Sequence, residues 1–406
     1  MKKIVYCLLF LISGYTAYAQ STKPVLNAFV KKGRGIGVVT ADSIFSVNFQ
    51  FRMQNRAAFV SKSNGLAPES FEFRVRRLRL KFEGFVYDPR ITYYFQLSFS
   101  RGDMDWRLTD SSKNNHSPNI VRDAVIYYSL TNNLKLGFGQ TKLPGNRQRV
   151  VSSGDLQFAD RSIVNATFNI DRDFGFFAHY TGNWVNLRGA ITSGEGRNSV
   201  SSNNKLAYTG RLEFLPLGKF TGKNDYIEGD LEREPTPKIS IASTYSINDD
   251  AVRQSGQLGN DLYEPRVIRN FEADVLVKYN GWAWYNEYMQ RNASNPVTSN
   301  GSSSSVRYIY VGSGYLSQLS YLFKNNVEVA ARYSTTVPFK AIYNDPAFPS
   351  VAEKKLEQIE LGITRYLVGH RLKVQGNLLY GKRTNLLTDS YDSDFWSAIF
   401  QVELGI

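Results

Sequence analysis

The densest group of side chains with binding chemistry lies in residues 71–82, which read FEFRVRRLRLKF. Five cations fall in this segment, and two more lie on the polar positions of the alternating segment before it. A guanidinium group donates two parallel hydrogen bonds to carboxylate or phosphate oxygens, whereas an ammonium group acts as a point charge. The cluster therefore predicts attraction of anions. Its members are Arg52, Arg56, Arg74, Arg76, Arg77, Arg79 and Lys81.

The apolar residues of segment 71–82 change phase within the cluster. Up to Val75 they occupy odd positions, and from Leu78 they occupy even positions. A β-bulge, which adds one residue to one strand of a pair, shifts the phase in this way. We therefore predict a bulge at Arg76 and Arg77, with which all five cations of the segment face one side.

The elements that must position these cations are strands. Most of the chain alternates apolar and polar residues with period two, which is the pattern of a strand whose two faces meet different surroundings. The clearest examples are residues 45–54, 91–100, 206–214, 271–279 and 396–406. The sequence thus indicates an all-β protein.

Short and long connections alternate along the chain, and together they predict sixteen strands. Short turns are expected at 88–90, 131–133, 182–183, 280–281, 324–326 and 368–370, and a seventh turn region, 216–237, is longer than the rest. Eight longer polar stretches cover 61–70, 101–119, 141–172, 193–204, 248–269, 292–305, 336–355 and 382–394.

An even strand number with this two-class rhythm predicts a 16-stranded antiparallel transmembrane β-barrel over residues 43–406, with short periplasmic turns and long external loops. In lipid every backbone N–H and C=O must find a partner within the protein, so a membrane-spanning sheet must close on itself. The 25 Tyr, 26 Phe and 5 Trp suit aromatic belts at the two interfaces. A soluble β-sandwich is the alternative, but it does not need two classes of connection.

The beginning of the chain predicts export. Residues 1–19 combine a basic start, an apolar run and an Ala-Tyr-Ala cleavage pattern, which is typical of a signal peptide. Residues 20–42 then form a periplasmic segment ahead of the barrel. The single cysteine, Cys7, excludes a disulfide scaffold. No other window reaches the roughly 20 apolar residues of a membrane helix, so the expected location is the cell outer membrane, surrounded by its lipid.

Within such a barrel the cations must face the lumen, because a charged side chain on the lipid face costs about 2–4 kcal/mol at mid-membrane. A basic wall attracts anions and repels cations. The alternative is a polar wall in which the arginines pair with Glu72, Glu83 and other acids. Residues 141–172, the longest loop, carry Arg149 together with apolar residues. We expect this loop to fold inward and narrow the pore, the alternative being a surface loop.

Four segments between residues 33 and 220 carry a family pattern. They are Gly33–Gly37 leading to Asp42 and Phe51-Arg52-Met53-Gln54, Arg74–Leu80, Arg122-Asp123-Ala124 through Gly139–Pro144 to Ser152-Ser153, and Gly210–Phe214 with Pro216 and Gly218. In these segments the chain resembles the phosphate-selective porin O and P family. The resemblance implies a sixteen-stranded outer-membrane porin, usually trimeric, with an inward third loop and arginines at the constriction. By position it places Arg52, Arg76, Arg77 and Arg149 there.

The expected function is therefore a passive diffusion channel selective for small anions such as phosphate, formed by a homotrimer. Two alternatives are a non-selective pore and a barrel that acts as a structural or docking partner in an outer-membrane complex. The three histidines lie far apart and no metal-ligand spacing occurs, so we expect no enzyme activity, no metal and no cofactor. Export and the dispersal of the +13 net charge also argue against nucleic-acid binding.

Overall fold

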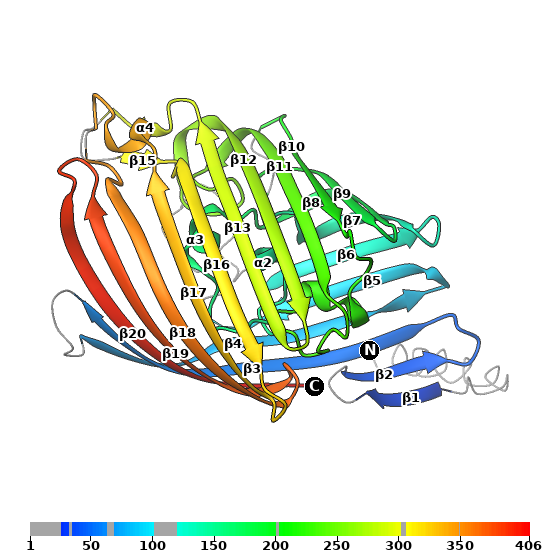
Figure 1. Cartoon of the computed structure of the whole chain (residues 1–406). Helices are drawn as coiled ribbons and strands as arrows, with labels where there is room; N and C mark the ends of the chain where they lie inside the picture. The colour runs from blue at the N-terminus through cyan, green and yellow to red at the C-terminus, as the bar shows by residue number, and fades with distance from the viewer. Residues whose placement is uncertain are drawn as a thin grey trace, which may run out of the picture.

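The computed structural model describes residues 26–31, 35–62, 69–100, 120–199, 203–301, 306–348 and 350–406. In this part of the chain, sixteen antiparallel strands follow one another and close into a barrel, because the last strand pairs with the first (Figure 1). The register of this closure runs from Phe395 opposite Lys62 to Gly405 opposite Arg52. The predicted strand number and topology are confirmed.

The barrel strands, in order, are β3(Ser46–Lys62), β4(Ser70–Val86), β5(Asp88–Ser98), β6(Val121–Ser129), β7(Leu134–Lys142), β8(Arg172–Thr181), β9(Val185–Thr192), β10(Ala207–Phe214), β11(Lys238–Arg253), β12(Asp261–Tyr279), β13(Trp282–Ala293), β16(Gly312–Leu322), β17(Val327–Pro338), β18(Lys354–Val368), β19(Leu372–Asn385) and β20(Ser390–Gly405). Where the structure describes them, the connections add the hairpin β14(Val297–Ser299) and β15(Val306–Tyr308) and four short helices, α2(Arg147–Val150), α3(Ile163–Phe168), η3(Thr221–Tyr226) and α4(Lys340–Tyr343). Among the described residues, none of these helices has the length and apolar character needed to span a membrane.

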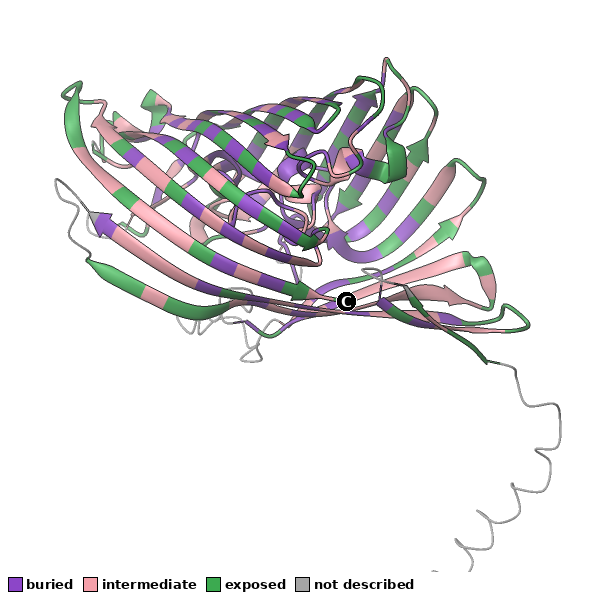
Figure 2. Ribbon diagram, turned by 60° about the horizontal axis from the view of Figure 1, so that its bottom comes forward, coloured by how far each residue is buried: buried purple, intermediate pink, exposed green. Residues whose placement is uncertain are grey.

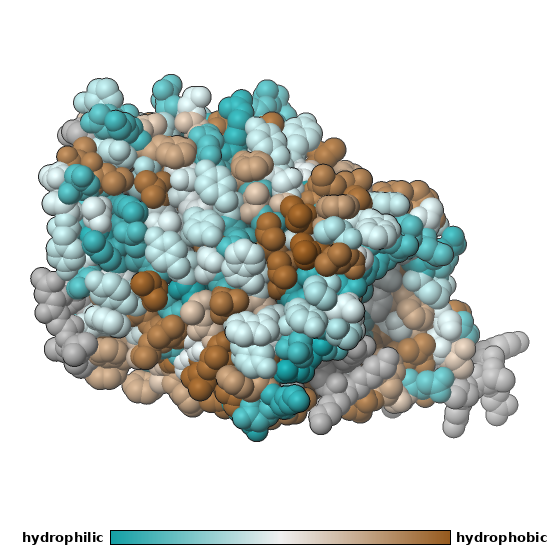
Figure 3. Space-filling view, viewed as in Figure 1, coloured by the Kyte–Doolittle hydropathy of each residue, from teal (hydrophilic) through white to brown (hydrophobic). Residues whose placement is uncertain are grey.

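The strands are polar inside and apolar outside. Along β10, Thr209, Arg211 and Glu213 are buried in the interior, whereas Tyr208 and Leu212 are exposed on the outer surface. The same alternation appears as stripes along the strands in Figure 2. Hydrophobic residues, in brown, are spread over the face of the barrel that Figure 3 shows. This inversion of the usual soluble pattern is what a barrel surrounded by lipid requires.

Several strands extend further than the sequence predicted. The expected loop 248–269 is reduced to residues 254–260, and the expected loop 382–394 to residues 386–389. About 10 residues suffice to cross the membrane, but β12 has 19. Beyond the membrane both faces of a strand meet water, so the alternation disappears while the backbone pairing continues. A prediction based on alternation therefore ends such strands too early.

A hairpin of β1(Leu26–Lys31) and β2(Gly35–Thr40) precedes the barrel. Strand β2 pairs with residues 46–49 of β3, which lie beyond the stretch of β3 that pairs with β20. The hairpin thus continues the sheet at the end of the barrel where the chain also terminates (Figure 1). The predicted signal peptide, residues 1–19, lies outside the described residues.

Candidate functional site

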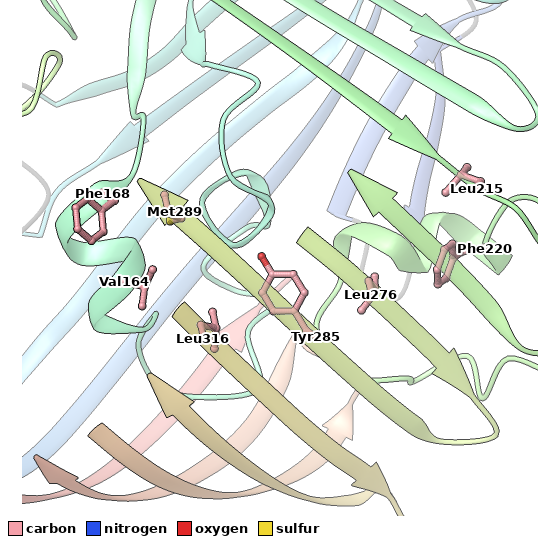
Figure 4. Close-up of a cluster of buried hydrophobic side chains, with 8 residues drawn as sticks. All are labelled: Val164, Phe168, Leu215, Phe220, Leu276, Tyr285, Met289 and Leu316. Atoms are coloured by element: carbon pink, nitrogen blue, oxygen red, sulfur yellow. The ribbon is translucent and has the colours of Figure 1, made fainter. Parts of the chain in front are cut away.

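The third long loop, residues 143–171 and called L3 below, folds into the barrel. Its helix α3 is capped by Ser162, the residue before the helix, whose side chain accepts a hydrogen bond from the Asn165 backbone N–H. Val164 and Phe168 of this helix then pack against inward-facing apolar residues of the wall (Figure 4). These wall residues are Leu276, Tyr285, Met289 and Leu316. The expectation that this loop narrows the lumen is confirmed.

A second segment enters the barrel from the opposite end. Residues 215–237, called the inner turn below, connect β10 to β11 and place Leu215 and Phe220 in the same apolar cluster. The inner turn also bonds to L3, because the Glu228 backbone N–H donates to the Asp155 carbonyl at 2.8 Å and the Gln157 N–H donates to Glu228 Oε2 at 2.9 Å. The two segments thus fill one half of the barrel together.

The wall that L3 covers runs over β11–β20 and β3, since its residues bond to Asp274, Arg332, Lys373 and Gln54 on those strands. Strands β4–β9 border the space that remains. Any path through the barrel therefore runs between L3 and this second wall.

Arg52 and Arg56, from the predicted set, face the interior but hold L3 in place. The Arg52 guanidinium donates to Ser153 Oγ at 2.8 Å and lies 3.8 Å from Glu403. The Arg56 guanidinium is ion-paired to Asp160 and donates to the Ala159 carbonyl at 3.0 Å. Both side chains are thus directed at L3 rather than at the open half.

Arg76 and Arg77 lie at a β-bulge, as the phase change predicted. Gln54 pairs with Arg77 and Asn55 with Val75, so Arg76 is the extra residue. Both arginines reach Asp160 Oδ1, at 3.1 and 3.3 Å. Partial burial acts to raise the pKa of Asp160, but the positive charges of these arginines and of Arg56 outweigh it and hold the pKa well below its usual value. One carboxylate thus serves three arginines.

Arg74 and Lys81 lie at the two ends of the cluster and pair with neighbouring acids. Arg74 forms an ion pair with Glu72, and both side chains are largely exposed to solvent. The Lys81 ammonium lies 2.9 Å from Glu83 Oε2. These two contacts agree with the alternative in which the cations of the wall are neutralised by acids.

The other predicted cations lie together. Arg76, Arg77, Arg79 and Arg149 line a cavity of about 370 Å³ between L3 and the open wall, called the basic cavity below. Nine of its lining residues are basic and one, Asp171, is acidic. The basic residues not in the predicted set are Arg122, Lys142, Arg161, Arg172 and Arg197.

Two cations of the basic cavity lack an acidic partner in the part of the chain that the structure describes. Among the described residues, neither the Lys142 ammonium nor the Arg161 guanidinium has a carboxylate within 4.0 Å. Both donate instead to the Val151 carbonyl, at 3.3 and 2.7 Å. Burial, together with the positive charges of Arg149, Arg77 and Arg79, lowers the pKa of Arg161 well below its ordinary value. Because arginine stays protonated in proteins, this cavity carries positive charge that the protein leaves uncompensated.

Sequence reasoning missed the five additional cations for two reasons. Arg122 occupies a second β-bulge, because Gln96 pairs with Asp123 and Leu97 with Val121. The adjacent charges Arg122 and Asp123 both face inward, and that adjacency was the available signal. Lys142, Arg161, Arg172 and Arg197 lie in loops or at the ends of strands, so only the folded loops bring them together.

The sequence of this chain matches a family of outer-membrane channels. Residues 47–394 match the model of a family described as phosphate-selective porin O and P. An uncharacterised protein of Aquifex aeolicus is 24% identical over 400 residues, which cover 87% of this chain and 89% of that protein.

Solved structures share the fold at low sequence identity, each over 89% of this chain. The outer-membrane channel DcaP of Acinetobacter baumannii has a TM-score of 0.56 at 12% identity, with 97% of that chain covered. Pseudomonas putida OprB has a TM-score of 0.55 at 11% identity and 94% coverage. An anion-selective porin from Comamonas acidovorans has a TM-score of 0.53 at 13% identity and 100% coverage.

Proposed function

Because the chain belongs to the phosphate-selective porin O and P family, and is therefore a passive outer-membrane channel rather than an enzyme, we propose that it conducts small anions such as phosphate. The observation that supports this selectivity most is the basic cavity. It lies beside the open wall and has nine basic lining residues against one carboxylate. Rings of arginine and lysine select anions in pores because the surrounding low-dielectric wall concentrates their field.

Lys142 and Arg161 contribute most to this proposal, because among the described residues they lack a carboxylate partner within 4.0 Å. A unit charge 4 Å from an ion in a water-like medium changes its energy by about 1 kcal/mol, which is about a fivefold change in population. Replacing both cations by glutamine removes their charge while each amide still donates a hydrogen bond. The loss of selectivity should therefore exceed fivefold.

The test is the reversal potential of the channel in a planar bilayer under a KCl gradient. We expect the wild type to show the sign of chloride, and the Lys142→Gln/Arg161→Gln double variant to reduce the chloride-to-potassium permeability ratio. Arg90→Gln is the matched control, because Arg90 is an exposed cation at the turn after β4 and pairs with Asp88. Equal ratios in the double variant and the wild type would contradict the proposal.

Two other outcomes identify the alternatives. A wild-type reversal potential of zero indicates a non-selective pore, as complete pairing of the type seen for Arg74 and Lys81 would produce. No conductance at all indicates a barrel that acts as a structural or docking partner. Phosphate preference is tested separately by adding phosphate to the chloride solution, which should inhibit the current in the wild type more than in the double variant.

We also propose that the protein is a homotrimer, with outer-membrane lipid around it and the hairpin β1–β2 in the periplasm. The support for the trimer is the family resemblance, and the support for the hairpin is its position at the end of the barrel with the short turns. Light scattering of the detergent-solubilised protein should give the mass of three chains. A mass of one chain would contradict the trimer.

A further inference from the structure

A second cavity adjoins the basic cavity. It has a volume of about 560 Å³ and shares Tyr94 and Lys142 with the basic cavity, so the two meet at these residues. Its other lining residues include Tyr127, Lys135 and His179, near the ends of strands that lead to short turns. We call it the aromatic cavity. Pockets that hold small organic ligands have volumes of about 300–1,000 Å³, so this space exceeds what an inorganic ion needs.

The ring of Tyr127 is held flat against the wall. Tyr127 pairs directly with Gly137 across strands β6 and β7. A Cβ atom at Gly137 would lie 2.6 Å from two carbon atoms of the ring, so only glycine allows this close approach. The centroid of the His179 ring lies 5.7 Å from that of Tyr127. Tyr127 therefore presents a fixed aromatic face within the cavity.

The acids of the aromatic cavity are paired, whereas one of its cations, Lys135, has no carboxylate partner among the described residues. The acids are engaged, since Asp123 accepts hydrogen bonds from Arg172 at 2.9 and 3.0 Å and Glu83 pairs with Lys81. Lys135 Nζ lies 5.5 Å from the Tyr127 ring centroid, and among the described residues it has no carboxylate within 4.0 Å. Within the described residues, an ammonium group without a carboxylate partner thus lies over a fixed ring.

From this pairing of ring and ammonium, we propose that the channel's preferred solutes include small aromatic carboxylates, whose carboxylate interacts with Lys135 or Lys142 while the ring packs on Tyr127 and His179. The proposal rests on the anion selectivity proposed above and adds a second recognition element to it. Aromatic pairs in offset or edge-to-face packing gain stabilisation beyond the apolar area that they bury, whereas an aliphatic ring gains from the buried area alone. Such weak contacts at successive positions also allow a solute to leave, as conduction requires.

The test compares benzoate with cyclohexanecarboxylate as inhibitors of the chloride current of the full-length protein in a planar bilayer. The two anions have the same charge and nearly the same size, and only benzoate is aromatic. We expect benzoate to inhibit half of the current at a concentration about two- to tenfold lower. Tyr127→Leu should bring the two concentrations together, whereas Tyr127→Phe should keep them apart. Tyr245→Leu, which changes an exposed tyrosine on the outer face of the barrel, is the control and should behave as the wild type.

Equal inhibition by the two anions in the wild type would overturn this proposal, as would an undiminished preference for benzoate in Tyr127→Leu. The comparison of benzoate with cyclohexanecarboxylate in the wild type tests the proposal even if the Tyr127→Leu variant does not fold. The reversal potential measured in the same membranes separates the two proposals. A reversal potential of the chloride sign without a preference for benzoate contradicts only the proposal of aromatic recognition. A reversal potential of zero contradicts the proposal of an anion-selective channel.

Discussion

Two groups of buried arginines in this barrel differ in how their charge is balanced. In the filled half, Arg147 of L3 and Arg211 of β10 lie against Glu213 and Asp274, with nitrogen–oxygen distances of 2.6–3.2 Å. We call these four residues the paired cluster. In the open half, the basic cavity has nine cations and one lining carboxylate. The same residue type thus anchors a loop in one half and leaves positive charge next to the path in the other.

This difference shows that the number of arginines in a barrel lumen is not enough to predict its ion selectivity. Two buried arginines against two carboxylates give no net charge, and such a group contributes to structure because its members satisfy one another. Arg52 and Arg56 also have a structural role, because both donate hydrogen bonds to L3. The anion selectivity that we propose depends on the cations whose charge remains uncompensated. Variants in the two halves should therefore separate stability from selectivity.

The largest effect is expected for Arg147→Gln. This change leaves Glu213 and Asp274 buried with Arg211 at 2.7–3.0 Å as their remaining close partner, while Arg188 lies 3.9 Å from Glu213. Breaking a buried ion pair by removing one partner costs about 3–5 kcal/mol, so the free energy of unfolding should fall by about this amount. Urea unfolding followed by tryptophan fluorescence measures it. A loss below 1 kcal/mol would show that the paired cluster does not anchor L3.

The next effect is acid sensitivity of the filled half through His370, in the turn between β18 and β19. Burial lowers the pKa of His370 well below its ordinary value, and the positive charges of Lys373, Lys278 and Arg371 act in the same direction, whereas the hydrogen bond to the Glu228 carbonyl opposes them. The imidazole is therefore neutral in the folded state. Its contribution to stability is complete above pH 6.5, the ordinary histidine pKa, and falls by up to about 1.4 kcal/mol per pH unit below it.

The measurement is the difference in unfolding free energy between pH 7.5 and pH 5.0 in the wild type and in His370→Gln. The wild type should lose about 2 kcal/mol more than the variant over this interval. Selectivity for anions should not fall between pH 7.5 and 5.0, because the arginines of the basic cavity stay charged. Identical pH dependence in the two proteins would rule out His370 as the acid-sensitive group.

A smaller effect on stability is expected for Arg161→Gln, the matched partner of Arg147→Gln. No carboxylate is left behind, and removal of a charge near Arg149, Arg77 and Arg79 relieves repulsion that offsets the lost hydrogen bonds. The free energy of unfolding should change by less than about 1 kcal/mol, while the chloride-to-potassium permeability ratio falls. A destabilisation as large as that of Arg147→Gln would remove the distinction between the two halves.

The smallest effect is expected for Arg74→Gln. Arg74 and Glu72 form an exposed ion pair, and such pairs contribute about 0–1 kcal/mol. The permeability ratio should change less than in Arg161→Gln, measured in the same bilayer system. A larger change in Arg74→Gln would mean that the outer end of β4, rather than the basic cavity, sets the selectivity.

The sequence predicted the parts of this molecule that depend on local alternation. The strand number, the inward face of β4 and the bulge at Arg76 all follow from the positions of apolar residues relative to one another. The extensions of β11 and β12 were missed because alternation disappears outside the membrane. The bulge at Arg122 was missed because it lies one residue into β6, where the alternation is too short to show a phase change.

The site itself could be predicted only in part. That Arg52 anchors a loop depends on where Ser153 lies once L3 has folded, about 100 residues further along the chain. Arg161 and Arg197 enter the basic cavity from two different loops, and no spacing between them signals that meeting. The residue types therefore indicated that the wall binds anions. Which cations are neutralised by acids and which are not depends on where L3 lies in the folded barrel.

The most direct test of this division is to locate anions in a crystal of the protein soaked in bromide, using anomalous diffraction. Our account predicts anomalous peaks in the basic cavity beside Lys142 and Arg161, and none at Arg147 and Arg211. An empty basic cavity, or bromide at the paired cluster in equal occupancy, would contradict the claim that uncompensated charge in the open half makes this channel select anions.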